Sequence, residues 1–388
     1  MNSLARVVWH RRTPERTPSA RAAELARLLE SDWQSGGAVR EVLRRILTLT
    51  DADEVDVLRA AAERALLAHC GDSVRLRGLI EFSNRCVLDC RYCGIRRGNR
   101  AVKRFSLSVD DVVGCARWCA DKGYGSLVLQ SGERRDPAFV RRVETMIRAI
   151  KAATRSAMQP DGLGITLCVG EQSEEAYARW FEAGAHRYLL RIETSSASLF
   201  AEIHPSTQRH ESRLACLKSL RALGYQVGTG GMIGLPGQTV EHLVDDLLFF
   251  RDMDVDMLGM GPYIPHAQTA LTGAIPSADE RLRLGLRMIA AARLLLRDVN
   301  IAATTALQAL ADDGREQGLT FGANVIMPQV TPPRVRAMYT LYDGKPCLDD
   351  TAEQCADCLE RRIASVGRRT LKHGWGDSVH FSARTGCK

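Results

Sequence analysis

The feature that most constrains the fold is an alternation of short apolar runs and amphipathic stretches between residues 74 and 332. The eight apolar runs are RLRGLIEFS, SLVLQSGE, GITLCVGE, RYLLRIET, QVGTGGMIGLPG, DMLGMGPYIPH, NIAATTA and NVIMPQVT. Between them, stretches such as SVDDVVGCARWCADKG and TVEHLVDDLLFF space apolar residues three and four apart, which is typical of helices. Eight strands that alternate with helices indicate an α/β fold, a (β/α)8 TIM-type barrel. A doubly wound open sheet is the alternative, because periodicity does not show whether a sheet closes.

The segments on either side of this alternation have different patterns. We expect a flexible N-terminal tail over residues 1–19 and an N-terminal helical layer over residues 20–72. The barrel would occupy residues 73–332, and residues 333–388 would form a cysteine-containing C-terminal extension. The first residues lack the long apolar region of a secretory signal, so we expect a cytoplasmic protein. Their faint resemblance to a transit peptide leaves a hydrogenosome or another organelle as the alternative.

Composition and charge narrow the class of protein. No apolar run approaches the roughly 20 residues of a membrane span, so no membrane partner is expected. Twelve cysteines without a secretory signal favour a reducing compartment, in which thiols bind metals or pack in the core. The net charge of +7 is mild and comes mainly from arginines spread along the chain. Because no lysine- and arginine-rich block or RNA-binding signature accompanies it, nucleic acid is not expected as a partner.

Three cysteines directly follow the first predicted strand, in the segment CVLDCRYCG. Cys86, Cys90 and Cys93 form a C-x3-C-x2-C pattern, and the active sites of barrels lie at the carboxyl ends of strands. Structural zinc usually takes four protein ligands, commonly from two separated pairs, and no second pair lies nearby. Clustered thiolates instead favour an iron–sulfur cluster, in which three thiolates leave one iron open to another ligand. Zinc and plain buried cysteines are the alternatives.

The same pattern, with an aromatic residue before the third cysteine, resembles the signature of the radical S-adenosylmethionine superfamily. The segments EFSNRCVLDCRYCGIRRGN, HRYLLRIET, GMIGLPGQT and GANVIMPQVTP occur in the order found in HydE maturases of FeFe-hydrogenase, a biotin synthase-like group. The resemblance covers about residues 74–360. It implies an enzyme with a 4Fe–4S cluster that cleaves S-adenosyl-L-methionine to a 5′-deoxyadenosyl radical and helps to assemble the diiron subcluster, or H-cluster. Biotin synthase, methylornithine synthase and a non-catalytic iron–sulfur scaffold are the alternatives.

The resemblance also assigns residues to the cofactor. The segment QSGE resembles the element that holds the methionine amino group, and Glu193 matches a residue that binds the ribose hydroxyls. Arg213 matches the arginine that pairs with the methionine carboxylate, and Met232 would lie near the adenine. Ile192 departs from the family pattern, which usually has histidine there, and this puts substrate details in doubt. The implied cofactor-binding set is Gln130, Gly132, Glu133, Arg191, Glu193, Arg213 and Met232.

Small polar residues are predicted at two further strand ends. Thr166 is expected to end the third strand, and residues 304–306 are expected to end the seventh. The resemblance places them in an internal cavity for a small anionic or carboxylate-bearing substrate, although threonine also simply favours strands. His266 is a candidate base, with a hydrogen-bonded core histidine as the equal alternative, and no catalytic residue is assigned beyond the cluster and cofactor. The implied cavity set is Thr166, Thr304, Thr305, Ala306, Tyr339 and Tyr342.

The C-terminal extension contains a second cysteine pattern. Cys347, Cys355 and Cys358 form C-x7-C-x2-C, which resembles the auxiliary iron–sulfur site of some HydE proteins. The implied group is a 2Fe–2S cluster with a fourth ligand other than cysteine, and zinc is the alternative. The resemblance further implies reduced ferredoxin or flavodoxin as electron donor, other hydrogenase maturases as partners, and a small-molecule or organometallic substrate.

Overall fold

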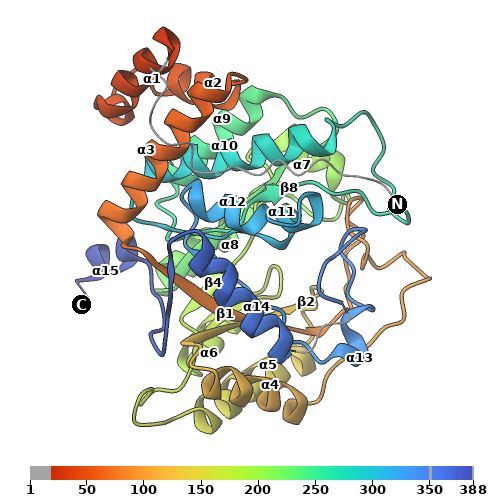
Figure 1. The fold of residues 1–388 in the computed structure, drawn as a ribbon. Coiled ribbons are helices and arrows are strands. Elements are labelled where there is room, and N and C mark those ends of the chain that lie inside the picture. The colour runs from red at the N-terminus through yellow and green to blue at the C-terminus, as the bar shows by residue number, and fades with distance from the viewer. Residues whose placement is uncertain (1–18, 349–351, 387–388) are drawn as a thin grey trace, which may run out of the picture.

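The computed structural model describes residues 19–348 and 352–386 and contains a sheet of parallel strands (Figure 1). Eight of these strands are neighbours in the order β10-β1-β2-β3-β4-β5-β7-β9, which follows the chain from β1 onward. Each of the eight predicted apolar runs contributes one of them. The strands are β1 (Ser73–Ser83), β2 (Ser126–Ser131), β3 (Gly164–Cys168), β4 (Arg187–Leu189), β5 (Gln226–Thr229), β7 (Met257–Leu258), β9 (Asn300–Ile301) and β10 (Val325–Ile326).

The first and last strands of this order meet, so the sheet closes on itself. A parallel bridge joins Ala302 to Val325, beside the ends of β9 and β10. The Ala303 amide donates to the Val325 carbonyl at 2.9 Å, and the Asn324 amide donates to the Ile301 carbonyl at 2.9 Å. The predicted TIM-type barrel is therefore confirmed over the open sheet. Two further strands, β6 (Met232–Ile233) and β8 (Gly261–Pro262), pair with each other beyond the ends of β5 and β7.

Helices follow the strands and surround the barrel. Serine caps fix where several begin: the Ser108 hydroxyl accepts from the Asp111 amide while the Asp111 carboxylate accepts from the Ser108 amide, both at 3.0 Å. In Figure 1, α4 to α6 lie on the opposite side of the barrel from α9 and α10. The helices of the barrel region are α4 (Val109–Asp121), α5 (Pro137–Ala153), α6 (Glu174–Glu182), α7 (Ala197–Ile203), α8 (His210–Ala222), α9 (Val240–Asp252), α10 (Ala278–Leu296), α11 (Thr305–Leu310), α12 (Gly314–Thr320) and α13 (Pro333–Arg336).

The N-terminal helices pack on one side of the barrel. They are α1 (Ala20–Glu30), α2 (Val39–Leu47) and α3 (Ala52–Cys70), and they lie beside α9 and α10 in Figure 1. Leu25, Leu43 and Leu58 are fully buried and belong to the same hydrophobic cluster as the barrel core. Burial of an apolar helix face of this kind removes it from water, which stabilises the layer.

The C-terminal extension closes the end of the barrel where the strands begin. It contains α14 (Ala352–Ser365), β11 (Arg369–Leu371) and α15 (Val379–Thr385), and β11 pairs with the start of β1. Arg187, the first residue of β4, is completely buried and forms an ion pair with Asp377 at 2.5 Å. Asn300, the first residue of β9, donates to the Gly376 carbonyl at 3.0 Å. Only the carboxyl ends of the strands are therefore left for a large active site.

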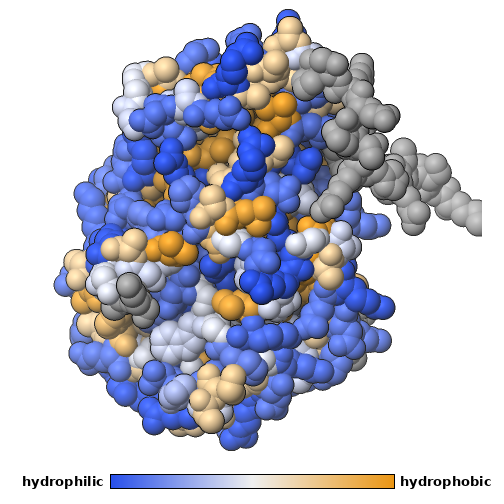
Figure 2. Space-filling model, turned by 60° about the vertical axis from the view of Figure 1, so that its left-hand side comes forward, coloured by the Kyte–Doolittle hydropathy of each residue, from blue (hydrophilic) through white to orange (hydrophobic). Residues whose placement is uncertain are grey.

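The surface drawn in Figure 2 is mainly hydrophilic, and its hydrophobic residues form small separate patches. Across the described residues, every helix is either too short or too polar to cross a membrane.

Candidate iron–sulfur and cofactor site

A long loop, residues 84–104, connects β1 to the segment before α4 and carries the three predicted thiols. The Asn84 side chain donates to the carbonyls of Lys103, at 2.9 Å, and Met338, at 2.7 Å. The Arg104 guanidinium donates to the carbonyls of Asn84, at 2.6 Å, and Ile95, at 2.7 Å. These contacts join the two ends of the loop to each other, connect the Arg104 end to the middle at Ile95, and anchor the Asn84 end to Met338.

The three thiols of this loop are half-buried and free of disulfide bonds. Burial raises the pKa of Cys90 well above its ordinary value, and the nearby Cys93 and Cys86 raise it further. Burial likewise raises the pKa of Cys93 to about 12. Thiols in such a setting ionise only when a cation compensates them, so the donor set fits an iron–sulfur cluster.

The spacing of the thiols also suits a cluster. Within the described residues, no three or more His, Cys, Asp or Glu side chains gather closely enough to hold one metal ion. A cluster does not require such a gathering, because each thiolate binds a different iron.

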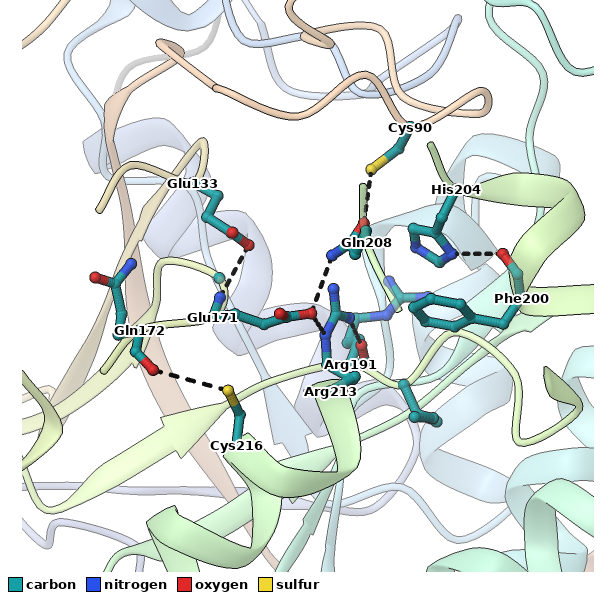
Figure 3. A network of polar contacts seen from close by, with 12 residues as sticks. Cys90, Glu133, Glu171, Gln172, Arg191, Phe200, His204, Gln208, Arg213 and Cys216 are labelled. Carbon is teal, nitrogen blue, oxygen red and sulfur yellow. Dashed lines mark hydrogen bonds and ion pairs between the residues drawn. The ribbon is translucent and has the colours of Figure 1, made fainter. Parts of the chain in front are cut away.

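A buried carboxylate, Glu171, connects the cysteine loop to the barrel (Figure 3). Glu171 follows β3, its side chain is 5% exposed, and it accepts from Arg213 Nε at 2.7 Å. It also accepts from Gln208 Nε2 at 3.1 Å and pairs with Arg135 at 3.2 Å. The other end of the Gln208 amide, Oε1, lies 3.6 Å from Cys90 Sγ. Glu171 thereby sets the positions of a guanidinium and of an amide that faces the Cys90 thiol.

Glu171 and Gln208 were not among the residues predicted from the sequence. The only available signal for Glu171 was its place at the end of the third apolar run, GITLCVGE. Gln208 lies between α7 and α8, far from any predicted strand end, so no pattern pointed to it.

Arg213 is a fixed, buried cation. Burial by itself would lower the pKa of the guanidinium, but the Glu171 carboxylate more than offsets this effect, so the pKa is raised. Its Nη1 donates to the Arg191 carbonyl, and its guanidinium lies 5.7 Å from the ring centre of Phe200. A guanidinium that is held on several sides is preorganised for a planar anion such as a carboxylate.

The end of β2 lies against the cysteine loop. A Cβ added to Gly132 would lie 2.7 Å from Cys86 Cβ, so only glycine permits this approach. Glu133 is buried; its carboxylate accepts from Arg135 Nε at 2.8 Å and from the Glu171 amide at 2.9 Å. Burial raises the pKa of the Glu133 carboxyl group, and Arg135 offsets part of this rise.

Arg191 and Glu193 lie together, although not on a strand as predicted. β4 ends at Leu189, and Glu193 adopts the left-handed region with φ of 67°. Arg191 Nη2 forms an ion pair with Glu193 at 2.8 Å. The Met232 amide donates to the Glu193 carbonyl at 3.0 Å, and Met232 packs in a small apolar cluster against Tyr92. The left-handed backbone at Glu193 therefore brings the Arg191–Glu193 pair beside the apolar cluster that contains Met232.

Two predictions about strand ends are wrong. Thr166 lies in the middle of β3, because the strand continues to Cys168. There it accepts from Arg187 Nε at 3.0 Å and lines a small internal cavity of about 20 Å³. Residues 304–306 do not end a strand, because β9 stops at Ile301. Thr304 precedes α11 and Thr305 begins it, with Ala306 following, so all three lie on the turn into that helix.

The two predicted tyrosines are buried or half-buried near these residues. Tyr339 is 2% exposed, and its hydroxyl accepts from Gln130 Nε2 at 3.3 Å. Burial raises the pKa of Tyr342 to about 12, and a hydrogen bond with Thr305 offsets part of the rise. The structure therefore brings Gln130 to Tyr339 and Thr305 to Tyr342.

His266 lies outside the barrel interior. Its Nδ1 accepts from the Gln268 amide at 3.1 Å, and its Nε2 is 3.8 Å from Asp343. A Cβ added to Gly94 would lie 2.4 Å from the His266 ring, so the histidine packs directly on the cysteine loop. This contact favours the hydrogen-bonded alternative over a base in the cavity.

The second cysteine pattern is only partly described. Cys347 has φ of 61°, its carbonyl accepts from Arg336 Nη1 at 3.2 Å, and its sulfur lies 3.9 Å from Arg315 Nη2. Cys358 is exposed on α14, whereas the side chain of Cys355 lies outside the described residues. One arginine, Arg315, therefore lies beside the Cys347 sulfur, and another, Arg336, binds its backbone.

A buried ion pair that the sequence did not reveal joins the extension to the barrel wall. Lys345 Nζ contacts both carboxylate oxygens of Glu81 on β1, at 2.6 and 2.7 Å, and the two side chains are 7% and 2% exposed. Gln329 donates to the same carboxylate at 2.8 Å. Lys345 also donates to the Tyr339 carbonyl at 2.8 Å and lies 5.2 Å from the centre of its ring. The pair therefore fixes the position of Tyr339.

These features together define a class of protein, a TIM-type barrel with a thiol-bearing loop at the carboxyl end of its first strand. Residues 80–250 match the radical SAM superfamily. Over 341 residues the chain is 42% identical to the [FeFe] hydrogenase maturase subunit HydE of Thermotoga maritima, which covers 87% of this chain and 93% of that protein. The chain belongs to the HydE family of radical SAM enzymes, as its motifs predicted.

More distant proteins share the fold. Biotin synthase of Corynebacterium jeikeium is 26% identical over 289 residues, covering 73% of this chain and 76% of that enzyme. The crystal structure of methylornithine synthase (PylB) has a TM-score of 0.75 at 21% identity, covering 90% of this chain and 98% of that one. The maturase HydG of Carboxydothermus hydrogenoformans has a TM-score of 0.72 at 17% identity, covering 90% and 79%.

The buried pair Glu81–Lys345 generates a prediction about stability. In Lys345→Met, Glu81 loses the cation that opposes the effect of burial, so its folded pKa rises further above its unfolded value of 4.5. A carboxyl group with a raised folded pKa destabilises the fold increasingly as the pH rises. We expect urea unfolding to show a loss of about 3–5 kcal/mol at about pH 8 and a smaller loss at about pH 5.

Two controls accompany this measurement. Lys345→Met/Glu81→Gln removes both charges and should recover much of the loss. Lys372→Met breaks an exposed pair with Glu360 and should cost less than about 1 kcal/mol. A loss for Lys345→Met that does not change between the two pH values would contradict the assignment.

Proposed function

We propose that this chain cleaves S-adenosyl-L-methionine reductively at a 4Fe–4S cluster held by Cys86, Cys90 and Cys93, and acts in assembly of the H-cluster of FeFe-hydrogenase. When bound, the cluster and S-adenosylmethionine supply a one-electron cleavage that yields methionine and a 5′-deoxyadenosyl radical. The observation that carries the proposal is the Glu171–Gln208–Cys90 arrangement, which links the buried cation Arg213 to one of the three free thiols. The 42% identity to the hydrogenase maturase subunit HydE of T. maritima supports the hydrogenase target.

The chain's own residues would orient the cofactor. Arg213 would donate to the methionine carboxylate, with Glu171 holding the guanidinium in place. The end of β2, including Gly132 and Glu133, would receive the methionine amino group. Glu193, held by Arg191, would bind the ribose hydroxyls.

Apolar residues would receive the adenine of the same cofactor. Met232 packs with Tyr92, the aromatic residue before the third cysteine, in a cluster that also contains Leu235 and Tyr263. A flat apolar ring system fits such a surface because it removes both partners from water.

The barrel interior would receive the substrate. Gln130, Tyr339 and Tyr342 would form one wall, which offers hydroxyl and amide groups. Lys345, paired with Glu81, holds Tyr339 in this wall through its backbone carbonyl. Thr304, Thr305 and Ala306 would border the same space from the turn into α11. Such a lining suits a small anionic or carboxylate-bearing substrate, including an organometallic one, because neutral donors bind anions without a fixed charge.

The C-terminal cysteines would hold an auxiliary cluster. A 2Fe–2S cluster at Cys347, Cys355 and Cys358 is supported by the arginines beside Cys347 and by the exposed position of Cys358. Its place on the extension, outside the barrel, supports an accessory role. We further propose that the protein works in the cytoplasm with other hydrogenase maturases and receives its electron from reduced ferredoxin or flavodoxin.

The biotin synthase alternative has less support. That activity requires a second, sacrificial cluster inside the barrel, which needs several thiols at the strand ends. Apart from the cysteine loop, Cys168 at the end of β3 is the one candidate thiol there within the described residues. A single thiol does not form such a site.

The first test concerns the cluster. We expect the reconstituted, reduced protein to show the electron paramagnetic resonance signal of a 4Fe–4S cluster, and S-adenosylmethionine to alter that signal. The Cys86→Ala/Cys90→Ala/Cys93→Ala variant should lose the altered signal because its irons lack ligands. As a control, Cys115→Ala/Cys119→Ala removes two thiols on α4 and should keep it. An altered signal that survives in the triple variant would reject the proposed cluster.

The second test concerns Arg213. Removing only Arg213 would leave the buried Glu171 carboxylate without its main cation. We therefore compare Arg213→Ala/Glu171→Gln with Glu171→Gln alone. Loss of a charged hydrogen-bonding partner costs about 1.5–3 kcal/mol, so S-adenosylmethionine should bind about 10- to 150-fold more weakly to the double variant. Isothermal titration calorimetry measures this difference. Equal affinities in two folded variants would exclude Arg213 as the carboxylate partner.

The third test concerns the extension. We expect Cys347→Ser/Cys355→Ser/Cys358→Ser to lose part of its iron and still produce 5′-deoxyadenosine with dithionite, because the electron need reach only the first cluster. Iron analysis and product chromatography measure the two quantities. If cleavage stopped while the signal of the first cluster persisted, the auxiliary site would be an electron relay rather than an accessory.

A further inference from the structure

Nearly all of the chain's net charge is concentrated in the cysteine loop. Residues 85–104 contain seven basic residues and one acidic residue, a net charge of +6, whereas the whole chain of 388 residues has a net charge of +7. The arginines are therefore spread along the sequence, but the excess positive charge is not.

The charges of this loop are almost entirely uncompensated. Among the described residues, Arg96 is the only one of the seven with a carboxylate in ion-pair distance, Asp89 at 2.9 Å. Arg104 donates to backbone carbonyls inside the loop, and Arg91 donates to the carbonyls of Glu202 and Ala270. The other five basic side chains are exposed. They are Arg85, Arg91, Arg97, Arg100 and Lys103.

The cofactor does not account for these exposed cations. Arg213 and Arg191, which we assign to the cofactor region, come from α8 and the segment after β4, not from this loop. Arg97, Arg100 and Lys103 have no side-chain contact with the Glu171 network in the described structure. Like charges gathered on a surface repel one another, so a patch of this kind favours an anionic partner from solution.

A groove of about 370 Å³ lies beside the patch. Its lining includes Lys103 and Val102 from the cysteine loop, His266 and Gln268 from the segment after β8, and Met338. The groove contains one acidic side chain, Asp343, which accepts a hydrogen bond from the Ala267 amide. The loop also exposes one large apolar side chain, Val87, at 46%. An apolar element within a charged surround is typical of protein interfaces.

The groove lies beside the part of the cysteine loop that contains Cys93. His266 lines the groove and packs on Gly94, where an added Cβ would lie 2.4 Å from its ring. Gly94 follows Cys93, whose sulfur is a proposed ligand of the first cluster. One side chain that lines the groove therefore packs on the backbone next to Cys93.

We propose that the exposed cations of residues 85–104 and the adjoining groove form the docking surface for an acidic one-electron carrier protein of the ferredoxin type. This inference rests on the proposed reductive cleavage of S-adenosylmethionine. Charge complementarity selects the carrier, because a surface with five exposed cations and one acidic groove residue, Asp343, attracts an acidic protein over long range. The electron must reach the cluster. A carrier bound at this surface would contact His266, which packs on Gly94 next to Cys93.

The test compares two reductants on one pair of variants. Arg97→Glu/Arg100→Glu/Lys103→Glu reverses three exposed charges of the loop. The matched control, Arg117→Glu/Arg141→Glu/Arg155→Glu, reverses three exposed arginines that lack ion-pair partners among the described residues, on α4, on α5 and just after α5. Both variants change the net charge equally. Formation of 5′-deoxyadenosine is measured with limiting reduced ferredoxin and, separately, with the reduced methyl viologen radical cation.

We expect the loop variant to lose at least about tenfold in ferredoxin-driven rate at about 20 mM salt and to stay within about twofold of the wild type with methyl viologen. The wild-type ferredoxin rate should fall as salt rises to about 300 mM, and the loop variant should lose this dependence. Equal ferredoxin rates in the loop and control variants would overturn the docking surface. Failure of the wild type to cleave S-adenosylmethionine with either reductant would instead overturn the proposed function.

Discussion

The site depends on one buried carboxylate, Glu171. A buried charge is tolerated only when it is paired and hydrogen-bonded, and Glu171 has three partners from three different segments. Each partner is fixed in return: Arg213 as a buried cation, Arg135 as the link to Glu133, and Gln208 as the amide that faces Cys90. The cost of leaving any of these groups unpaired makes the arrangement specific.

The C-terminal extension contacts both ends of the barrel, in a different way at each. At the end where the strands begin, Asp377 pairs with the completely buried Arg187 and Asn300 binds the Gly376 carbonyl, which closes that end. At the other end, the extension reaches back through Lys345 to Glu81 and braces the wall beside Tyr339. The C-terminal extension is thus part of the barrel's architecture, because it compensates charges at both ends.

Much of the site was predictable because its signals are local. The order of the strands follows the order of the apolar runs, and C-x3-C-x2-C needs only one loop to bring three thiols together. Predictions failed where strand length mattered: Thr166 lies within β3, and Thr304 lies beyond β9. Apolar runs mark where a strand passes through the core but not where its hydrogen bonds stop, since neighbouring strands decide that.

The sequence by itself determined the alternation of strands and helices, the cysteine loop and the family, because each is encoded in spacing along the chain, whereas closure of the sheet was seen only in the structure. Only the tertiary structure decided which charges meet. Glu81 and Lys345 are 264 residues apart, and Glu171 and Arg213 are 42 apart. The positive excess of residues 85–104 was present in the sequence, yet only folding showed that five of its cations are exposed without a carboxylate partner among the described residues, beside a groove whose His266 packs on Gly94. Pairing of charges depends on distance in space, which no local pattern records.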